Sequence, residues 1–195
     1  AKGLLTINDL PTVTVSSATI CAGDNPATFT ASPTPATGST ISAYKWSANG
    51  TGTVDTTFGT AAGNYTVEVT DDKGCKASNT GTLRVNQKPV VTVKDSSICA
   101  DWPAAVFTAV VDSAVQTYAW SENGSGSSQT ASGSTAGNYK VDIVDVNGCI
   151  GDATGVLTVN PLPIVGNKPA AMCDGEPATV GEVIPGGGTY TYSWD

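Results

Sequence analysis

The sequence predicts an all-β chain made of tandem β-sandwich repeats of about 74–78 residues each. The first observation behind this prediction is internal repetition, because Trp46, Trp120 and Trp194 recur at a spacing of 74 residues. The second is that apolar and polar residues alternate, which is the two-residue period of a strand with one buried face. The third is that turn-forming residues recur about every 8–12 residues, as they do in sandwiches.

Other motifs recur in register with these tryptophans and set the repeat boundaries. Cys21, Cys99 and Cys173 lie 78 and 74 residues apart, and the Gly74-Cys75 pair recurs at 148–149. Short Pro-bearing joints separate the copies. The expected organisation is the last strand of a preceding repeat at 1–9, complete repeats at 10–86 and 87–160, and the first half of a truncated third repeat at 161–195.

The alternation also identifies the expected core. Tyr65 and Tyr139 each begin a run in which every second residue is apolar, which predicts a strand with one buried face. Trp46 and Trp120 stand in the middle of another alternating strand, so we expect these indoles inside the sandwich and not on a sugar-binding surface. The predicted core residues are Trp46, Trp120, Tyr65 and Tyr139.

Composition limits the function classes. The net charge is −8 and there is no histidine. An acidic surface repels nucleic acid and anionic lipid, so neither is an expected partner. The longest apolar stretches span only a few residues, so we expect no membrane insertion. Without histidine the commonest general base is missing, and no catalytic constellation is visible, so we predict no enzymatic activity and no cofactor.

Three motifs carry a resemblance to a known class of protein. They are Cys-Ala-Gly-Asp at 21–24, Tyr-Lys-Trp at 44–46 and the stretch from Gly63 to Cys75. The pattern of this last stretch recurs in residues 137–149. They resemble the PKD-like and immunoglobulin-like tandem repeats of giant secreted surface proteins of the Bacteroidetes, including gliding-motility adhesins. The resemblance implies immunoglobulin-like sandwiches, export through the type IX pathway and an extracellular location at the cell surface.

Five cysteines in register in an export-type chain favour disulfides over metal or redox chemistry. One pairing stays within repeats, as Cys21–Cys75 and Cys99–Cys149, and leaves Cys173 unpaired by truncation. The alternative is Cys21–Cys149 between repeats. It arises because Cys21 precedes one strand and Cys75 follows another, so they are expected at opposite ends of a sandwich, about 20 Å apart, whereas bonded cysteines need Cα atoms within about 7 Å. Free thiols are the third option.

Several other residues are candidates for binding or modification. The calcium candidates are Asp71, Asp72 and Asp145, although their glycine-bearing stretches also fit plain hairpin turns and lack a full set of six ligands. Thr56 and Ser113 fit the O-glycosylation acceptor of the Bacteroidetes. Trp102 lies in a loop that has no tryptophan in the other repeats, and it is a candidate contact residue.

Two functions remain open from the sequence. The first is a structural stalk or filament, with the chain itself or neighbouring repeats as partners in a fibre. The second is an adhesin module that binds surface glycans or other cells, with Trp102 in contact.

Overall fold

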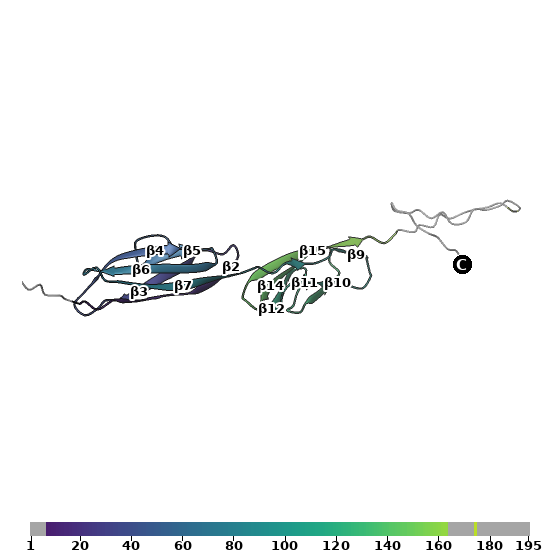
Figure 1. The fold of residues 1–195 in the computed structure, drawn as a ribbon. Helices are drawn as coiled ribbons and strands as arrows, with labels where there is room; N and C mark the ends of the chain where they lie inside the picture. The colour runs from purple at the N-terminus through teal and green to yellow at the C-terminus, as the bar shows by residue number, and fades with distance from the viewer. Residues whose placement is uncertain (1–6, 164–173, 175–195) are drawn as a thin grey trace, which may run out of the picture. The chain divides into compact units, whose positions relative to one another are not determined.

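The structure, a computed structural model, describes residues 7–163 and residue 174. Every regular element within 7–163 is a β-strand, and the fold is all-β (Figure 1). No helix in this part of the chain is long and apolar enough to cross a bilayer. The expected strand at 1–9 and the partial repeat at 161–195 lie largely outside the described residues.

The first sandwich is built from seven strands in two sheets. One sheet has the order β1-β3-β5 and the other the order β2-β7-β6-β4. Neighbouring strands are antiparallel, except that β2 and β7 are parallel. This arrangement is an immunoglobulin-like sandwich. The strands are β1 (Thr12–Val15), β2 (Ala18–Cys21), β3 (Ala27–Thr34), β4 (Ile41–Ala48), β5 (Thr56–Gly59), β6 (Gly63–Asp71) and β7 (Lys76–Asn86).

The chain crosses from one sheet to the other between β1 and β2, at Ser16. The Ser16 backbone nitrogen donates to the Thr30 carbonyl at 3.3 Å, and the Ser16 hydroxyl accepts from the Thr30 nitrogen at 3.0 Å. On the other side, a Cβ at Gly81 would overlap the Ser16 carbonyl oxygen, so only glycine permits this approach. The crossing places Cys21, the last residue of β2, opposite Asn86 at the end of β7.

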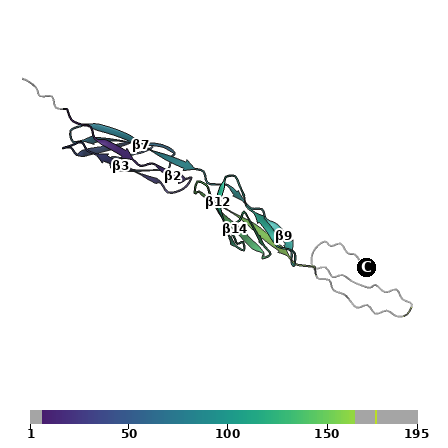
Figure 2. The same cartoon turned by 90° about the horizontal axis from the view of Figure 1, so that it is seen from below.

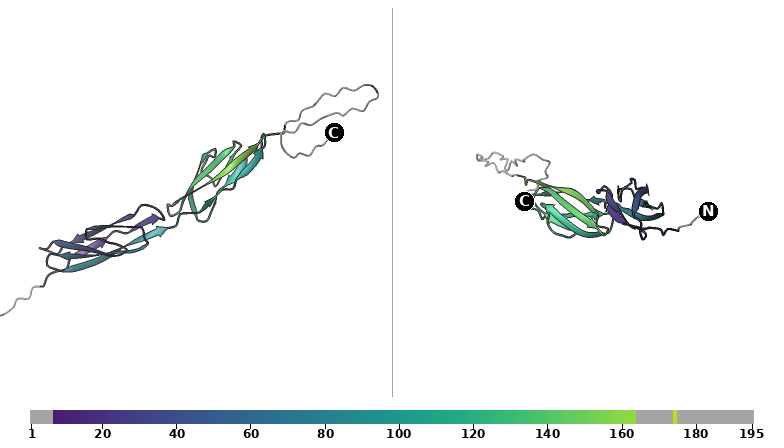
Figure 3. Two further views of the ribbon diagram at one scale, coloured as in Figure 1. Left: turned by 90° about the horizontal axis from the view of Figure 1, so that it is seen from above. Right: turned by 90° about the vertical axis from the view of Figure 1, so that its left-hand side faces the viewer.

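The second sandwich has the same plan. One sheet has the order β12-β14-β15-β9, again with its edge strand parallel to the last strand, and the other layer consists of the pairs β10-β13 and β11-β8. Figure 2 labels β9, β12 and β14, and Figure 3 gives two further views of both sandwiches. The strands are β8 (Val91–Thr92), β9 (Ser96–Cys99), β10 (Ala105–Thr108), β11 (Val110–Val111), β12 (Val115–Glu122), β13 (Thr130–Gly133), β14 (Gly137–Asp145) and β15 (Ile150–Asn160).

A stacked pair of aromatic rings joins the two layers of each sandwich. The ring centroids of Phe29 and Tyr65 are 4.0 Å apart, and those of Phe107 and Tyr139 are 4.2 Å apart. Each tyrosine hydroxyl donates to a backbone carbonyl four residues upstream, at 2.9 and 3.0 Å. This is the tyrosine corner of immunoglobulin-like domains. Both tyrosines are buried, as the alternation predicts.

Both central tryptophans belong to the core. Trp46 is 5 % exposed and Trp120 is 7 % exposed. Their indole nitrogens donate to the carbonyl oxygens of Val54 and Ser128, each at 2.9 Å. A buried indole needs such an acceptor, so these residues are structural.

The described chain forms two compact units that differ from the sequence repeats. The first unit comprises the chain up to Val91 together with Val111–Thr117 and Ile143–Asp152. The second comprises Thr92–Val110, Tyr118–Asp142 and the residues from Ala153. Each sheet nevertheless stays within 12–86 or 91–160.

Candidate functional site

Cys21 is held at the end of β2, where the parallel pairing with β7 stops. The backbone nitrogen of Ala22 donates to the Asn86 carbonyl oxygen at 2.8 Å, which closes this pairing. A tight turn follows, in which Gly23 supplies a φ of 82°. The Asp24 carboxylate accepts a hydrogen bond from the Cys21 backbone nitrogen at 3.1 Å. Strand and turn together fix the direction of the Cys21 side chain.

Cys149 lies in the hairpin between β14 and β15, and Asp145 fixes its backbone. The Oδ1 atom of Asp145 accepts hydrogen bonds from the backbone nitrogens of Asn147 and Cys149, both at 2.8 Å. Burial of the Asp145 carboxyl raises its pKa. The hydrogen bonds from Cys149, Asn147 and Gly148 outweigh that effect and hold the pKa below its ordinary value of 3.8. The ionised Asp145 carboxylate therefore accepts the hydrogen bonds that hold this turn together.

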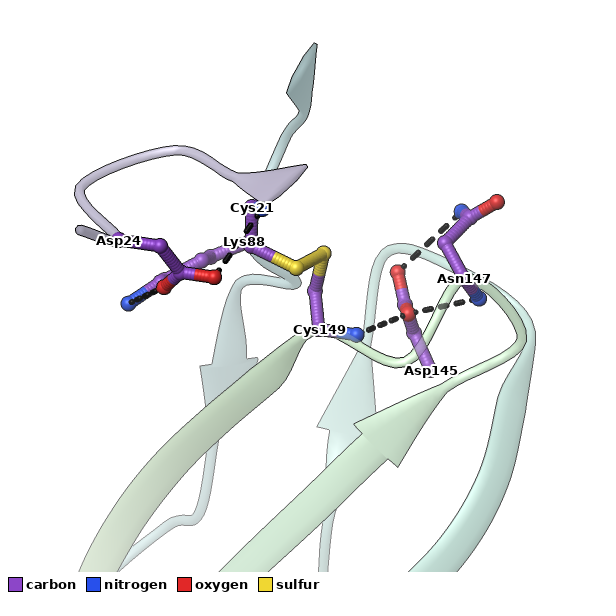
Figure 4. The surroundings of a disulfide bond; sticks show 6 residues. All are labelled: Cys21, Asp24, Lys88, Asp145, Asn147 and Cys149. Atoms are coloured by element: carbon purple, nitrogen blue, oxygen red, sulfur yellow. Dashed lines mark hydrogen bonds and ion pairs between the residues drawn. A yellow bond between two sulfur atoms is a disulfide. The ribbon is translucent and has the colours of Figure 1, made fainter. Parts of the chain in front are cut away.

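A disulfide joins Cys21 to Cys149 across a sequence separation of 128 residues (Figure 4). Their Cα atoms are 5.6 Å apart, which is within the usual range for a disulfide. Both cysteines belong to the first compact unit. Beside the bond, Lys88 Nζ lies 3.4 Å from Asp24 Oδ1. This inter-repeat disulfide is the between-repeat alternative that the sequence left open.

The within-repeat pairs Cys21–Cys75 and Cys99–Cys149 are wrong, and strand register explains why. Cys21 pairs with Asn86 at the end of β7, whereas Cys75 precedes the start of that strand. The strand has 11 residues. At about 3.3 Å per residue its two ends are roughly 35 Å apart, far beyond the reach of a disulfide. The register of β9 with β15 separates Cys99 from Cys149 in the same way.

Cys75 and Cys99 carry free thiols, and both are partly exposed. Cys75 occupies the β6–β7 turn, where the Asp71 Oδ1 atom accepts from its backbone nitrogen at 2.7 Å. Cys99 is the last residue of β9. Cys173, predicted to be unpaired, lies outside the described residues.

Each calcium candidate takes part in a turn. Asp71 and Asp145 use Oδ1 to bind backbone nitrogens of their own hairpins. Asp72 instead binds the backbone nitrogen and hydroxyl of Thr40. The Asp71 Oδ2 atom has no hydrogen-bond partner among the described residues. Within 7–163 and 174, no group of three or more histidine, cysteine or acidic side chains is placed to hold a metal ion.

The remaining candidates lie at the surface or near it. Trp102 is 61 % exposed in the loop after β9. Thr56 begins β5 and is partly exposed, and Ser113 is exposed just before β12. Contact by Trp102 and glycosylation of Thr56 and Ser113 stay predictions.

Sequence reasoning missed two features of the site. The first is the ion pair of Asp24 with Lys88, which are 64 residues apart and show no common pattern. The second is the role of Asp145 in positioning Cys149. The Asp-x-x-Gly-Cys spacing, present at 71–75 and at 145–149, was the available signal for it.

No protein-family model and no curated protein sequence matches the chain. Among solved structures, similar chains include an I-band fragment of titin, with 16 % identity and a TM-score of 0.42 over 80 % of this chain and 66 % of that fragment. Extracellular domains 3–5 of Drosophila OTK share 15 % identity, with a TM-score of 0.34 over 80 % and 66 %. SGBP-B of a Bacteroides ovatus mixed-linkage glucan utilization locus, solved with a mixed-linkage heptasaccharide, shares 16 % identity, with a TM-score of 0.29 over 78 % and 48 %.

The chain thus covers about two thirds or less of each of these three solved chains. The assignment of the immunoglobulin-like fold is based on the strand order of each sandwich. Similarities this remote say nothing about the activity of the chain. The affiliation with PKD-like repeats of the Bacteroidetes stays a prediction from the sequence motifs.

Proposed function

We propose that the chain is a structural spacer of an extracellular bacterial stalk or filament, in which consecutive repeats are covalently linked to resist tension. The observation that supports the proposal is the disulfide between Cys21 of the first repeat and Cys149 of the second. A bond confined to one repeat would protect only that repeat. A bond across 128 residues closes a loop that contains most of both sandwiches.

The path of an applied force shows what this bond does mechanically. When the chain is pulled from both sides, tension reaches Cys21 and passes through the two sulfur atoms to Cys149. The strands from β3 to β14 lie inside the closed loop and carry no load. A loop of this length would add on the order of 400 Å if it were extended. The disulfide therefore keeps that length from being released.

The same bond supports an extracellular location in this proposal. Disulfides persist in oxidising surroundings outside the cytosol, which fits a secreted protein. The net charge of −8 keeps such a surface soluble and repels nucleic acid. In this proposal the chain has no catalytic role, and export through the type IX pathway is an expectation from the resemblance.

Single-molecule stretching of the oxidised chain tests the proposal. The wild-type chain should extend by on the order of 400 Å less than the Cys149→Ser variant before it is fully taut. The Cys75→Ser variant is the matched control and should behave as the wild type, since Cys75 is not bonded. Equal extension of the wild type and Cys149→Ser would overturn the proposal.

The second candidate function is an adhesin module that binds surface glycans, and the exposure of Trp102 favours it. An exposed indole offers a flat apolar face for stacking on a sugar ring. Glycan-array binding that Trp102→Ala abolishes and Phe58→Ala preserves would support this function. If the chain bound no glycan on the array, the adhesin function would be excluded.

A further inference from the structure

We infer that Trp102 and Leu162 form an apolar contact that closes the joint after the second sandwich. After the first sandwich this place is taken by an ion pair, in which Lys88 Nζ lies 3.4 Å from Asp24 Oδ1 (Figure 4). The inference goes beyond the proposed function, because it depends on strand register and not on the disulfide.

The two joints begin from the same strand pairing. Cys21 ends β2 opposite Asn86, and Cys99 ends β9 opposite Asn160, each in a parallel pair with the last strand of its sandwich. In both pairs the backbone nitrogen after the cysteine donates to the asparagine carbonyl oxygen at 2.8 Å. The short strand and the last strand therefore end side by side, with the same backbone geometry in both sandwiches.

The turn after the cysteine places Trp102 where Asp24 lies in the first sandwich. Each is the third residue after its cysteine. Its backbone nitrogen donates to the cysteine carbonyl oxygen, at 3.1 Å for Asp24 and 3.2 Å for Trp102. The residue before it has a positive φ in both turns, 82° at Gly23 and 64° at Asp101. The side chains of Asp24 and Trp102 therefore start from equivalent positions.

The joint places Leu162 where Lys88 lies in the first repeat. Each stands two residues after the asparagine that ends the strand pairing and one residue before the joint proline. Because a proline favours an extended conformation in the residue before it, both residues leave the last strand in a similar direction. Leu162 is therefore expected beside Trp102, as Lys88 is beside Asp24.

The two positions change chemistry together, from a charged pair to an apolar pair. Trp102 is 61 % exposed and Leu162 is 45 % exposed, so both side chains have apolar surface that gains by burial. An indole and a leucine associate by burial, as opposite charges do by Coulomb attraction. Each joint thus has a matched pair of side chains.

The turn leaves the Trp102 ring free to reach Leu162. In the first sandwich the Asp24 carboxylate also accepts a hydrogen bond from the Cys21 backbone nitrogen at 3.1 Å. An indole has a donor and no acceptor, so Trp102 cannot form the corresponding bond to the Cys99 nitrogen. Its side chain is therefore not held back in the turn and can lie against the joint.

The contact restrains the chain where it leaves β15, as the ion pair does where it leaves β7. Salt screens an ion pair near the surface and leaves an apolar contact in place, so the second joint keeps its restraint at high ionic strength. Most of the Trp102 side chain stays exposed, so the contact is compatible with glycan binding to the rest of the indole.

Proton NMR of the full oxidised chain tests the contact directly. We expect nuclear Overhauser effects between the indole ring protons of Trp102 and the methyl protons of Leu162. Leu162→Ala should remove these signals. Leu10→Ala is the matched control, because Leu10 also stands one residue before a joint proline and should leave the signals unchanged. Absence of the signals from the wild type would overturn the inference.

Thermal unfolding measures the coupling of the two side chains. Trp102→Ala and Leu162→Ala should each lower the Tm by about 2–4 °C, which corresponds to a modest contact in a chain of this size. The double variant should fall little further, since one truncation already removes the contact. The effects of Trp102→Ala and Leu10→Ala should add, which makes this pair the control. Additive effects of Trp102→Ala and Leu162→Ala, or no effect of either, would contradict the contact.

Exchange of the pair tests whether the two joints share one geometry. Trp102→Asp alone should lower the Tm, because a carboxylate then stands beside Leu162. Adding Leu162→Lys should restore part of the loss at low salt, and about 1 M salt should cancel this gain by screening. A double variant no more stable than Trp102→Asp at low salt would count against the shared geometry. None of these outcomes involves the Cys21–Cys149 bond, so failure of the inference would leave the proposed function standing.

Discussion

The Oδ1 atom of Asp145 lies 2.8 Å from the backbone nitrogen of Cys149, so a buried carboxylate fixes the residue that bonds to Cys21. The same relationship holds between Asp71 and Cys75 at 2.7 Å. Turn and disulfide are therefore coupled, because disorder in the turn would move the sulfur that forms the bond. This coupling leads to the first two predictions.

Asp145→Ala should weaken the inter-repeat disulfide. The backbone nitrogens of Asn147 and Cys149 would lose their buried acceptor, so the turn would loosen and Cys149 would be easier to reduce. We expect a lower Tm for the oxidised chain, by several degrees, and more alkylated Cys149 at a fixed dithiothreitol concentration. Asp142→Ala is the control, because Asp142 forms a half-exposed ion pair with Lys140, and ion pairs near the surface contribute little. Equal reducibility of both variants would contradict the coupling.

The stability of the chain should fall in acid through Asp145. Its folded-state pKa is lowered below the ordinary value of 3.8, so its contribution is fully present above that value. The contribution is lost as the pH falls from 3.8 through the lowered folded-state pKa. The Tm of the wild type, measured from about pH 6 to about pH 2, should decline more steeply in this window than that of Asp145→Asn. Parallel curves would show that the carboxylate is not the cause.

Removal of the inter-repeat disulfide should destabilise the chain. Cys149→Ser removes the bond between two residues that are 128 positions apart, so the conformational entropy of the unfolded chain increases. We expect a loss of about 2–4 kcal/mol, seen as a lower urea midpoint without reductant. Cys75→Ser should leave the midpoint unchanged, because that thiol is free. Dithiothreitol should bring the wild type to the midpoint of Cys149→Ser, and a persistent difference would speak against the bond as the source.

Gly59 should not tolerate a side chain. A Cβ at this position would overlap the Tyr65 hydroxyl and ring, which form the tyrosine corner and stack on Phe29. Gly59→Ala should therefore destabilise the chain by about 1–3 kcal/mol through overpacking. Phe58→Ala on the same strand is the control, because Phe58 is exposed. The midpoint of urea unfolding distinguishes the two variants, and a stable Gly59→Ala would mean that the tyrosine has room to move.

The core of the sandwiches could be predicted from local pattern. The two-residue period places Tyr65 and Trp46 inward whatever their partners are, and both are buried. The crossing at Ser16 could not be predicted. It depends on a close approach to Gly81, a residue 65 positions away, and it creates the parallel pairing of β2 with β7.

The sequence could not decide between the two disulfide pairings for a related reason. Repeat spacing put Cys21 and Cys75 in one repeat, whereas the expected strand order put them at opposite ends of the sandwich. The register of Cys21 with Asn86 decides between these two expectations, because it separates the two cysteines by a whole strand. The Asp24–Lys88 ion pair depends on the same long-range arrangement. Local alternation cannot encode such contacts, because they join residues from different strands and turns.

Mass spectrometry of the unreduced, alkylated wild-type chain after cleavage before aspartate tests the central claim most directly. The account predicts a cross-link between peptide 9–23, which contains Cys21, and peptide 145–151, which contains Cys149. A cross-link from 9–23 to 72–94, which would join Cys21 to Cys75, would contradict it.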